Sequence, residues 1–268
     1  MHTDIFLEIG GEHKVCEDYI IQGTTPVPYI ILSDGCSTAN GSEMGARILC
    51  HLAKQFLKYN KDDIHDLDYW KLGTWVIHNA EQTARQLGLS TSCLTATLIV
   101  AYYIDNRIRI MIYGDGSFIN IDPLGNLEIT TVDYSSNAPY YLVYLVDSFR
   151  HGLYDEAKHT KKVTHRFNDG SETIEEYSYD HPLDYLLSTT VTPTVLIASD
   201  GVDSFLRKSG QVTQQLKSHE IIPACTAFKN IKGEFLKRRL NRQMKTFEKS
   251  GISHYDDLSM GAFIKEVK

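Results

Sequence analysis

The chain has 268 residues, of which 42% are hydrophobic and 23% are charged, and its formal net charge is −7. This composition is typical of a globular protein, and it excludes a collagen-like, low-complexity or disordered chain. The excess of acids, 34 against 27 basic residues, argues against a nucleic-acid binder.

The N-terminal residues and the cysteines indicate the compartment. The first residues lack the basic and apolar regions of a secretory signal. No run approaches the roughly 20 apolar residues of a membrane span. The five cysteines form no CxxC pair, which makes a zinc site or a thioredoxin-like site unlikely to be their purpose. We therefore expect a cytoplasmic protein with reduced thiols, no membrane contact and a single domain over residues 1–268.

The first third of the chain predicts one strand and two helices. Residues 28–33 (PYIILS) form a short apolar run that ends at Asp34-Gly35, as expected for a buried strand entering a turn. Apolar residues at helical spacing predict a helix over 43–57, with Ser42 as its N-cap. A second helix is predicted over 69–87.

Two antiparallel hairpins are predicted next. Residues 93–104 and 107–113 flank the tight-turn pair Asp105-Asn106. Residues 117–121 and 127–132 flank a second turn. Together with the preceding helices, these hairpins predict an α+β fold in which antiparallel sheets are covered by helices.

The second half of the chain is less regular. Residues 133–190 are polar, and we expect loops, short strands and a mobile flap there, or alternatively a disordered insert. A buried strand is predicted over 195–198, helices over 202–217 and 233–249, and a last strand over 258–264. The helix over 233–249 is strongly basic. The basic face of this helix is either simply solvated or a surface that holds acidic phosphopeptides.

Acidic residues recur where predicted strands end or begin. Asp34, Asp115 and Asp200 each precede a glycine at such a point, Glu17-Asp18 follow the first segment, and Asp256-Asp257 precede the last strand. A single Asp-Gly pair is usually a turn. Several acids at strand ends can converge on one edge of a layered fold, where they repel one another unless a cation lies among them. Carboxylate oxygens suit Mg²⁺ or Mn²⁺ better than zinc.

These stretches resemble the metal-dependent protein phosphatases, the type 2C serine/threonine phosphatases. The resemblance extends over nearly the whole chain and keeps the family's motif order. It implies a four-layer α-β-β-α sandwich of two antiparallel sheets flanked by helices. The matching stretches are residues 13–18 (HKVCED), 32–35 (LSDG), 92–97 (SCLTAT), 114–117 (GDGS), 196–201 (LIASDG) and 256–259 (DDLS).

The resemblance also implies a metal site. Two Mn²⁺ or Mg²⁺ ions would share a water, lower its pKa and neutralise the phosphoryl oxygens while the resulting hydroxide attacks phosphorus in line. A third, looser ion is held in bacterial members. The implied ligands are the bridging Asp34, the Gly35 carbonyl, Asp200 and Asp257, with Asp115 at the third ion and Glu17 and Asp18 acting largely through water. Asp34, Asp200 and Asp257 are thereby the implied catalytic residues.

Two positions depart from the family's pattern. His13, followed by Lys14, stands where the family usually has an arginine that binds the substrate phosphate. Histidine lacks the bidentate fork of arginine. Cys36 stands where several eukaryotic members have a histidine that can act as general acid. A subset of bacterial relatives is similar at the first position, with a histidine there and an acid pair after a cysteine, and bacterial members often lack the histidine at the second.

The expected activity is hydrolysis of phosphoserine and phosphothreonine in proteins that a serine/threonine kinase has phosphorylated. The two departures leave open a pseudophosphatase, in which the same fold serves as a binding or regulatory module. A metallohydrolase of small phosphorylated metabolites is a third hypothesis. No motif for reading DNA or RNA is evident.

Overall fold

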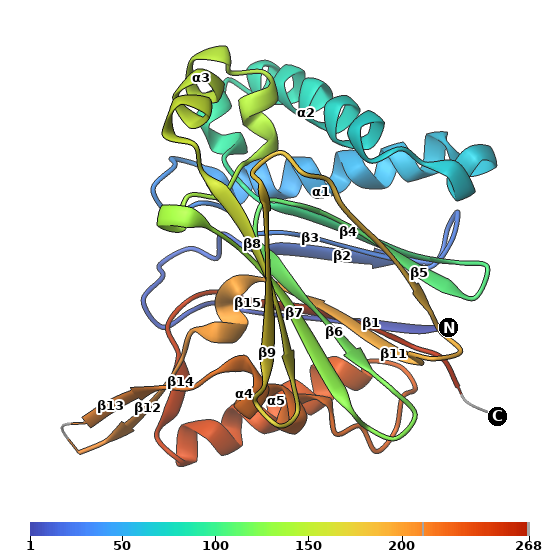
Figure 1. Ribbon diagram of the computed structural model, residues 1–268, viewed down its shortest axis with the longest axis vertical. Helices are drawn as coiled ribbons and strands as arrows, with labels where there is room; N and C mark the ends of the chain where they lie inside the picture. The colour runs from blue at the N-terminus through green and yellow to red at the C-terminus, as the bar shows by residue number, and fades with distance from the viewer. Residues whose placement is uncertain (211, 267–268) are drawn as a thin grey trace.

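The computed structural model describes residues 1–210 and 212–266. Two large antiparallel sheets lie face to face, and helices cover the outer face of each sheet (Figure 1). The predicted four-layer α-β-β-α sandwich is therefore confirmed.

The larger sheet has seven strands, and all neighbouring strands run antiparallel. In order across the sheet they are β1 (His2–Glu8), β15 (Leu258–Ile264), β11 (Thr194–Ala198), β6 (Gly116–Ile121), β7 (Leu127–Tyr134), β8 (Thr160–Phe167) and β9 (Glu172–Ser178). The predicted strands at 195–198 and 258–264 are adjacent here, so the acids that flank them lie at neighbouring strand ends.

The second sheet has five strands, and a third, small sheet has three. The five-stranded sheet runs in the order β10 (Leu183–Ser188), β5 (Arg107–Tyr113), β4 (Leu98–Ile104), β3 (Tyr29–Ser33) and β2 (Tyr19–Gly23). The small sheet runs in the order β13 (Val212–Gln215), β12 (Phe205–Ser209) and β14 (Ile252–His254).

The helices divide between the two outer faces (Figure 1). Helices α1 (Ser42–Tyr59) and α2 (Tyr69–Gln86) cover the five-stranded sheet, and α3 (Ser148–Ala157) lies on the same side. Helices α4 (Ser218–Thr226) and α5 (Phe235–Lys249) cover the seven-stranded sheet. None of the helices in the described residues is both long enough and apolar enough to cross a membrane.

Three apolar layers hold these elements together. Between the sheets, side chains such as Ile30, Ile99 and Phe263 are fully buried. A second layer joins α1 and α2 to the five-stranded sheet, and a third joins α4 and α5 to the seven-stranded sheet. Each sheet is thus covered on both faces, which explains why every residue of β3 and of β15 is buried rather than every second one.

Both predicted hairpins form as expected. Strands β4 and β5 pair through the turn at Asp105 and Asn106, whose φ angles are 47° and 60°. Asp and Asn tolerate this left-handed region better than most residues, and it is what a tight two-residue hairpin turn requires. Strands β6 and β7 form the second hairpin.

Two local predictions were wrong, and a third was incomplete. Ser42 does not cap α1: Gly41 occupies the N-cap position, and the Ser42 hydroxyl donates to Glu17 instead, at 2.9 Å. The described residues of the span 202–217 form no α-helix: a short 3-10 helix ends at Asp203, and strands β12 and β13 follow it. In the span 133–190, where loops and short strands were expected, three paired strands do form, but the prediction lacked the helix α3. The side chains of β9 are almost all exposed, so the sequence there carries no alternation between buried and exposed residues.

Candidate active site

Four aspartates from four separate segments line one cavity of about 280 Å³. Asp34 directly follows β3, Asp115 directly precedes β6, Asp200 follows β11, and Asp256 lies shortly before β15. The two sheets contribute to the cavity together. Its other lining residues are His13, Gly35, Cys36, Ser37, Thr38, Thr97, Asn137, Pro139 and Tyr141.

Asp34 is fixed by the strand beside it. Its backbone N–H donates to the Thr97 hydroxyl at 3.0 Å, and its carbonyl accepts from the Thr97 N–H at 2.8 Å. Thr97 itself is buried and directly precedes β4. The turn after β3 is thereby held by hydrogen bonds, which leave the Asp34 side chain facing the cavity.

The cavity concentrates negative charge. Burial, followed by the carboxylates of Asp18, Asp200 and Asp115, raises the pKa of Asp34 well above its usual range. Burial and the Asp200 carboxylate do the same for the pKa of Asp115. Within the described residues, no lysine or arginine lines the cavity. The cluster therefore lacks a strong protein cation to offset its carboxylates.

Asp18 lies buried behind this cluster. One of its oxygens accepts a hydrogen bond from the Ser199 hydroxyl at 2.8 Å. The other, Oδ1, is buried without a partner in the described part of the chain. Burial raises the pKa of Asp18 to about 8, with the Asp200 and Asp257 carboxylates acting in the same direction. An unpartnered buried carboxylate oxygen is costly unless a water or a cation completes its contacts.

The structure distinguishes the two acids of the last motif. Asp257 is buried, and its oxygens accept from the backbone N–H groups of Gly10 and Glu17 at 2.7 and 2.6 Å. Asp256, not Asp257, lines the cavity. The predicted ligand Asp257 thus lies outside the cavity lining: its carboxylate ties the N-terminal loop to the start of β15, and Asp256 is the acid of this pair that lines the cavity.

Close packing at Gly201 fixes the position of this motif. A Cβ atom at Gly201 would lie 1.8 Å from the Asp257 carbonyl oxygen. Glycine is therefore required where the chain after Asp200 passes the segment that holds Asp256 and Asp257. The Asp-Gly pair after β11 is not only a turn, because its glycine permits two acidic segments to approach each other.

His13 lies among the acids. Its Nε2 is 3.2 Å from Asp256 Oδ1, and its Nδ1 is 3.3 Å from Asp257 Oδ2 and 3.6 Å from Glu17 Oε2. Its side chain remains 19% exposed and lines the cavity. His13 can therefore contact an anion in the cavity, while its interaction with Asp256 competes with that role.

The remaining predicted site residues differ in whether they line the cavity. Gly35 lines it, whereas Lys14 is exposed and does not. Glu17 does not line it either, and its carboxylate accepts from Ser42. Asp256 and Tyr141 were missed. The adjacent acids at 256 and 257 offered a signal for the first, but nothing in the sequence distinguished which of the two faces inward.

The residues fit divalent cations in donor chemistry. Carboxylate oxygens from Asp34, Asp115, Asp200 and Asp256 surround one cavity, and hard oxygen donors are what Mg²⁺ and Mn²⁺ prefer. The unpartnered Asp18 oxygen points to the same requirement. In the described ranges, no three His, Cys, Asp or Glu side chains are already grouped closely enough to hold one ion. Cation binding would therefore draw these carboxylates closer together.

Substitution of Asp257 should mainly lower stability, whereas substitution of Asp256 should mainly weaken Mn²⁺ binding. Asp257→Ala leaves two buried backbone donors without acceptors, so we expect the free energy of unfolding to fall by about 2–5 kcal/mol. Asp256→Ala should change stability little and weaken Mn²⁺ binding by about tenfold or more. Urea unfolding and calorimetric Mn²⁺ titration of both variants measure the two effects. Equal loss of Mn²⁺ affinity without loss of stability in Asp257→Ala would contradict this assignment.

A second hollow of about 440 Å³ adjoins the acidic cavity. The two share Cys36, Thr38, Asn137, Pro139 and Tyr141 among their lining residues. Arg150 of α3 is the one cationic side chain that lines this hollow within the described residues. Its guanidinium donates to the Thr95 hydroxyl at 3.1 Å and pairs with Asp147 at 3.3 Å.

Comparison with known proteins was made at two levels. The sequence model of one family, described as protein phosphatase 2C, matches residues 11–245. No curated protein sequence matches the chain.

Several solved structures are similar over essentially their whole length. A bacterial serine phosphatase is 14% identical, with a TM-score of 0.61 and coverage of 100% of this chain and 99% of that chain. The serine/threonine phosphatase Stp1 from Staphylococcus aureus is 13% identical, with a TM-score of 0.57 and coverage of 100% and 96%. The serine/threonine phosphatase PstP/Ppp from Mycobacterium tuberculosis is 15% identical, with a TM-score of 0.51 and coverage of 98% of both chains. At these identities the likeness shows a shared fold.

Proposed function

Since the chain belongs to the protein phosphatase 2C family, we propose that it is a metal-dependent phosphatase that hydrolyses phosphoserine and phosphothreonine in proteins. The observation that carries this proposal is the convergence of four aspartates on one cavity that no lysine or arginine lines in the described residues. Such a cavity repels the phosphate of a substrate unless cations occupy it first.

Mn²⁺ or Mg²⁺ would be held by Asp34, Asp115, Asp200 and Asp256, with the Gly35 carbonyl beside them. Two such ions, with a third, looser one at Asp115, would supply an activated water and would neutralise the charge on the phosphoryl oxygens. Thr97 holds Asp34 in place by its two hydrogen bonds, and Ser199 fixes one oxygen of Asp18. His13 faces the cavity and can donate a hydrogen bond to the substrate phosphate.

The adjoining hollow supports a substrate with an extended chain. It begins at residues shared with the acidic cavity and leads to Arg150. A small phosphomonoester would fill the acidic cavity alone, whereas a phosphopeptide would continue into the hollow. The Arg150 guanidinium can there meet a backbone carbonyl or an acidic side chain of the substrate.

A comparison of substrates tests this proposal. With Mn²⁺, we expect kcat/KM for a phosphoserine or phosphothreonine peptide to exceed that for small phosphomonoesters, and EDTA to abolish both activities. Arg150→Gln should lower kcat/KM for the peptide by about tenfold, as for loss of one charge-assisted hydrogen bond, and should leave para-nitrophenyl phosphate hydrolysis unchanged. Activity that persists in EDTA would refute the metal-dependent mechanism, and preference for small phosphomonoesters would favour a metabolite hydrolase.

One observation favours a second candidate, a pseudophosphatase that acts as a binding or regulatory module. His13 lies 3.2 Å from Asp256 and 3.3 Å from Asp257, so a protonated imidazole can neutralise part of the cluster without a metal ion. A chain that uses this contact permanently would bind divalent cations weakly. Calorimetry distinguishes the candidates, because absence of Mn²⁺ binding at millimolar concentration excludes the proposed catalyst.

We further propose a cytoplasmic location and substrates phosphorylated by a serine/threonine kinase. All five cysteines are free thiols, which is usual in a reducing compartment. We also retain the proposal of a single domain, in which part of the 133–190 segment acts as a flap, since Asn137, Pro139 and Tyr141 from this segment line the acidic cavity.

A further inference from the structure

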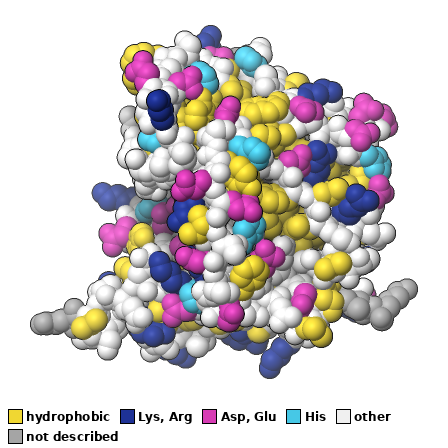
Figure 2. Space-filling view, viewed as in Figure 1, with side chains coloured by type: hydrophobic (Ala, Val, Ile, Leu, Met, Phe, Trp, Pro, Cys, Tyr) yellow, Lys and Arg dark blue, Asp and Glu magenta, His cyan; other side chains and the backbone are white. Residues whose placement is uncertain are grey.

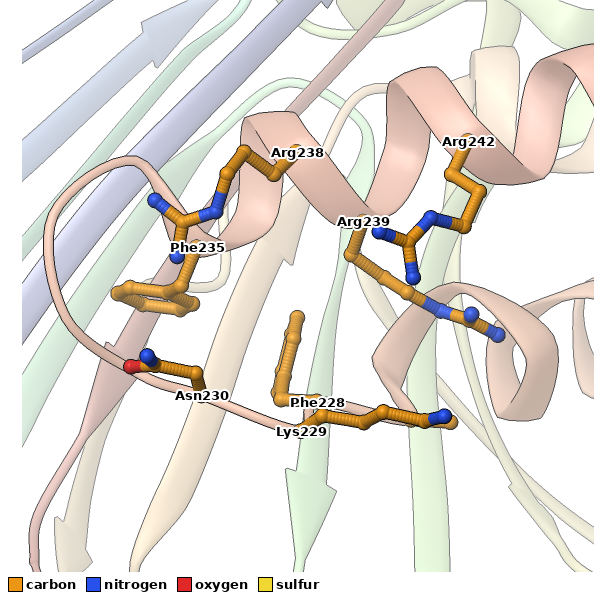
Figure 3. A pocket seen from close by; sticks show the side chains of 8 residues that line it. Phe228, Lys229, Asn230, Phe235, Arg238, Arg239 and Arg242 are labelled. Atoms are coloured by element: carbon orange, nitrogen blue, oxygen red, sulfur yellow. The ribbon is translucent and has the colours of Figure 1, made fainter.

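A cavity separate from the acidic cavity and its adjoining hollow lies in the helical layer that covers the seven-stranded sheet. It is found between the first turns of α5 and the connection from α4 (Figure 3). Its volume is about 110 Å³, and it shares no lining residue with the acidic cavity. We call it the basic pocket. It is lined by Ala227, Phe228, Lys229, Asn230, Phe235, Arg238, Arg239 and Arg242.

The charge of the basic pocket contrasts with that of the whole chain. Three guanidinium groups and one ammonium group line it, and none of its lining residues is acidic, although the chain carries a net charge of −7. Like charges gathered around one concave site repel one another. In Figure 3 the three arginines come from neighbouring turns of α5, and the Arg238 guanidinium lies beside Phe235 while Arg239 extends away from it, toward α4.

Two of the arginines have structural roles. Arg239 donates from Nε to the Ala224 carbonyl at 2.7 Å, which satisfies an acceptor at the C-terminal end of α4. Arg238 donates to the Lys232 carbonyl at 2.7 Å and so holds the connection before α5. These hydrogen bonds shape the wall of the basic pocket and account for two of its four cations.

Arg242 and Lys229 have no such role. Within the described residues, neither side chain forms an ion pair or a side-chain hydrogen bond, yet both line the basic pocket. In the view of Figure 3, the guanidinium of Arg242 and the ammonium of Lys229 lie on the same side of Phe228. Both side chains are exposed, and no contact within the described residues occupies them, so their charged ends remain available to a ligand.

Two phenylalanine rings supply an apolar wall. Phe228 and Phe235 meet edge to face, with ring centroids 5.3 Å apart and planes at 87°. Phe235 is buried, whereas Phe228 is half-buried and keeps part of its ring available. A ligand that combines an anion with a compact carbon group would contact both the cations and this ring.

We propose that the basic pocket is a non-catalytic binding site for a phosphomonoester dianion, whose carbon group rests against Phe228. Guanidinium groups match phosphate with paired N–H donors, which favours phosphate over a carboxylate of single charge. Arg242 and Lys229 supply the free donors, and Arg238 and Arg239 add positive charge from positions that the fold already fixes. This site is independent of the proposed catalysis, because none of its residues lines the acidic cavity.

Calorimetric titration with benzylphosphonate, a phosphate analogue that phosphatases do not hydrolyse, tests the proposal. EDTA is included so that no metal ion in the acidic cavity can bind the probe. We expect one site in the unmodified chain and a dissociation constant at least about tenfold higher in Arg242→Gln, as for loss of a charge-assisted hydrogen bond. Lys229→Gln combined with Arg242→Gln should weaken binding further.

Lys245→Gln is the matched control, because Lys245 lies on the same helix, is exposed and does not line the basic pocket. It should bind benzylphosphonate as the unmodified chain does. Two further probes distinguish the source of the phosphate: tighter binding of a phosphoserine peptide than of benzylphosphonate indicates a protein ligand, and the reverse order indicates a small molecule. Absence of binding by the unmodified chain, or equal binding by Arg242→Gln, overturns the proposal. Hydrolysis of para-nitrophenyl phosphate should be the same in all variants, which separates this test from that of the catalytic site.

Discussion

Asp34→Asn is expected to lower kcat of the Mn²⁺-dependent phosphatase reaction by at least about 10²- to 10³-fold, the range seen when one preorganised electrostatic contact is removed from an active site. Asp34 lies where the carboxylates of Asp18, Asp115 and Asp200 all act on it, so its charge contributes to the whole cluster. The amide of Asn keeps the shape of the side chain and one oxygen but removes the negative charge. Steady-state hydrolysis of a phosphoserine peptide at saturating Mn²⁺ measures the effect.

The control for this variant is Asp62→Asn. Asp62 has a side chain that is 87% exposed and contacts Lys61 at 4.0 Å, so its substitution should leave kcat and stability unchanged. Circular dichroism and thermal unfolding of Asp34→Asn establish that the fold is retained. If a folded Asp34→Asn chain keeps the full rate, the acidic cavity is not the catalytic centre.

The fold could be predicted where burial imposes a pattern on the sequence. Strand β3 is buried throughout and ends at the Asp34-Gly35 turn, and β4 and β5 are joined by the turn at Asp105 and Asn106. Both elements form as predicted. Strand β9 escaped prediction because almost all of its side chains are exposed, so its place in the sheet depends on backbone pairing with β8. Strand β13 is likewise exposed. Pairing of this kind leaves no periodic signal in the sequence.

The site could be predicted at the level of segments but not of every side chain. The acids after β3 and β11 and before β6 do converge on one cavity, as their recurrence at strand ends suggested. Which of Asp256 and Asp257 faces the cavity could not be predicted, because the two residues are identical and adjacent. It is decided by the backbone N–H groups of Gly10 and Glu17, which lie about 240 residues away in the sequence and capture the second carboxylate.

The net charge conceals two local sites of opposite sign. Acids converge on the cavity between the strand ends, while the basic helix α5 and the connection before it surround a pocket without carboxylates. On the face that Figure 2 shows, acidic and basic side chains are interspersed. The value of −7 therefore describes neither cavity, and each must be tested by its own ligand.

Mn²⁺ is expected to raise the melting temperature of the chain by about 5–10 °C at 100 times its dissociation constant. Binding at that ratio stabilises the folded state by about 2.7 kcal/mol, and each kcal/mol shifts the melting temperature of a chain of this size by about 2–4 °C. The physical reason is that the cations relieve repulsion among Asp34, Asp115, Asp200 and Asp256. Differential scanning calorimetry with EDTA and with increasing Mn²⁺ measures the shift.

Asp34→Asn should affect the melting temperature differently in the absence and in the presence of Mn²⁺. Without metal, loss of one charge from a repelling cluster should leave the melting temperature unchanged or raise it, because fewer carboxylates must be held together. With Mn²⁺, the same variant should show a smaller shift than the unmodified chain, because one oxygen ligand has lost its charge. Substitutions that merely loosen the fold lower the melting temperature in both conditions. A melting curve of the unmodified chain that does not respond to Mn²⁺ would instead support the binding module, in which the His13 side chain contacts Asp256 and Asp257 in place of a metal ion.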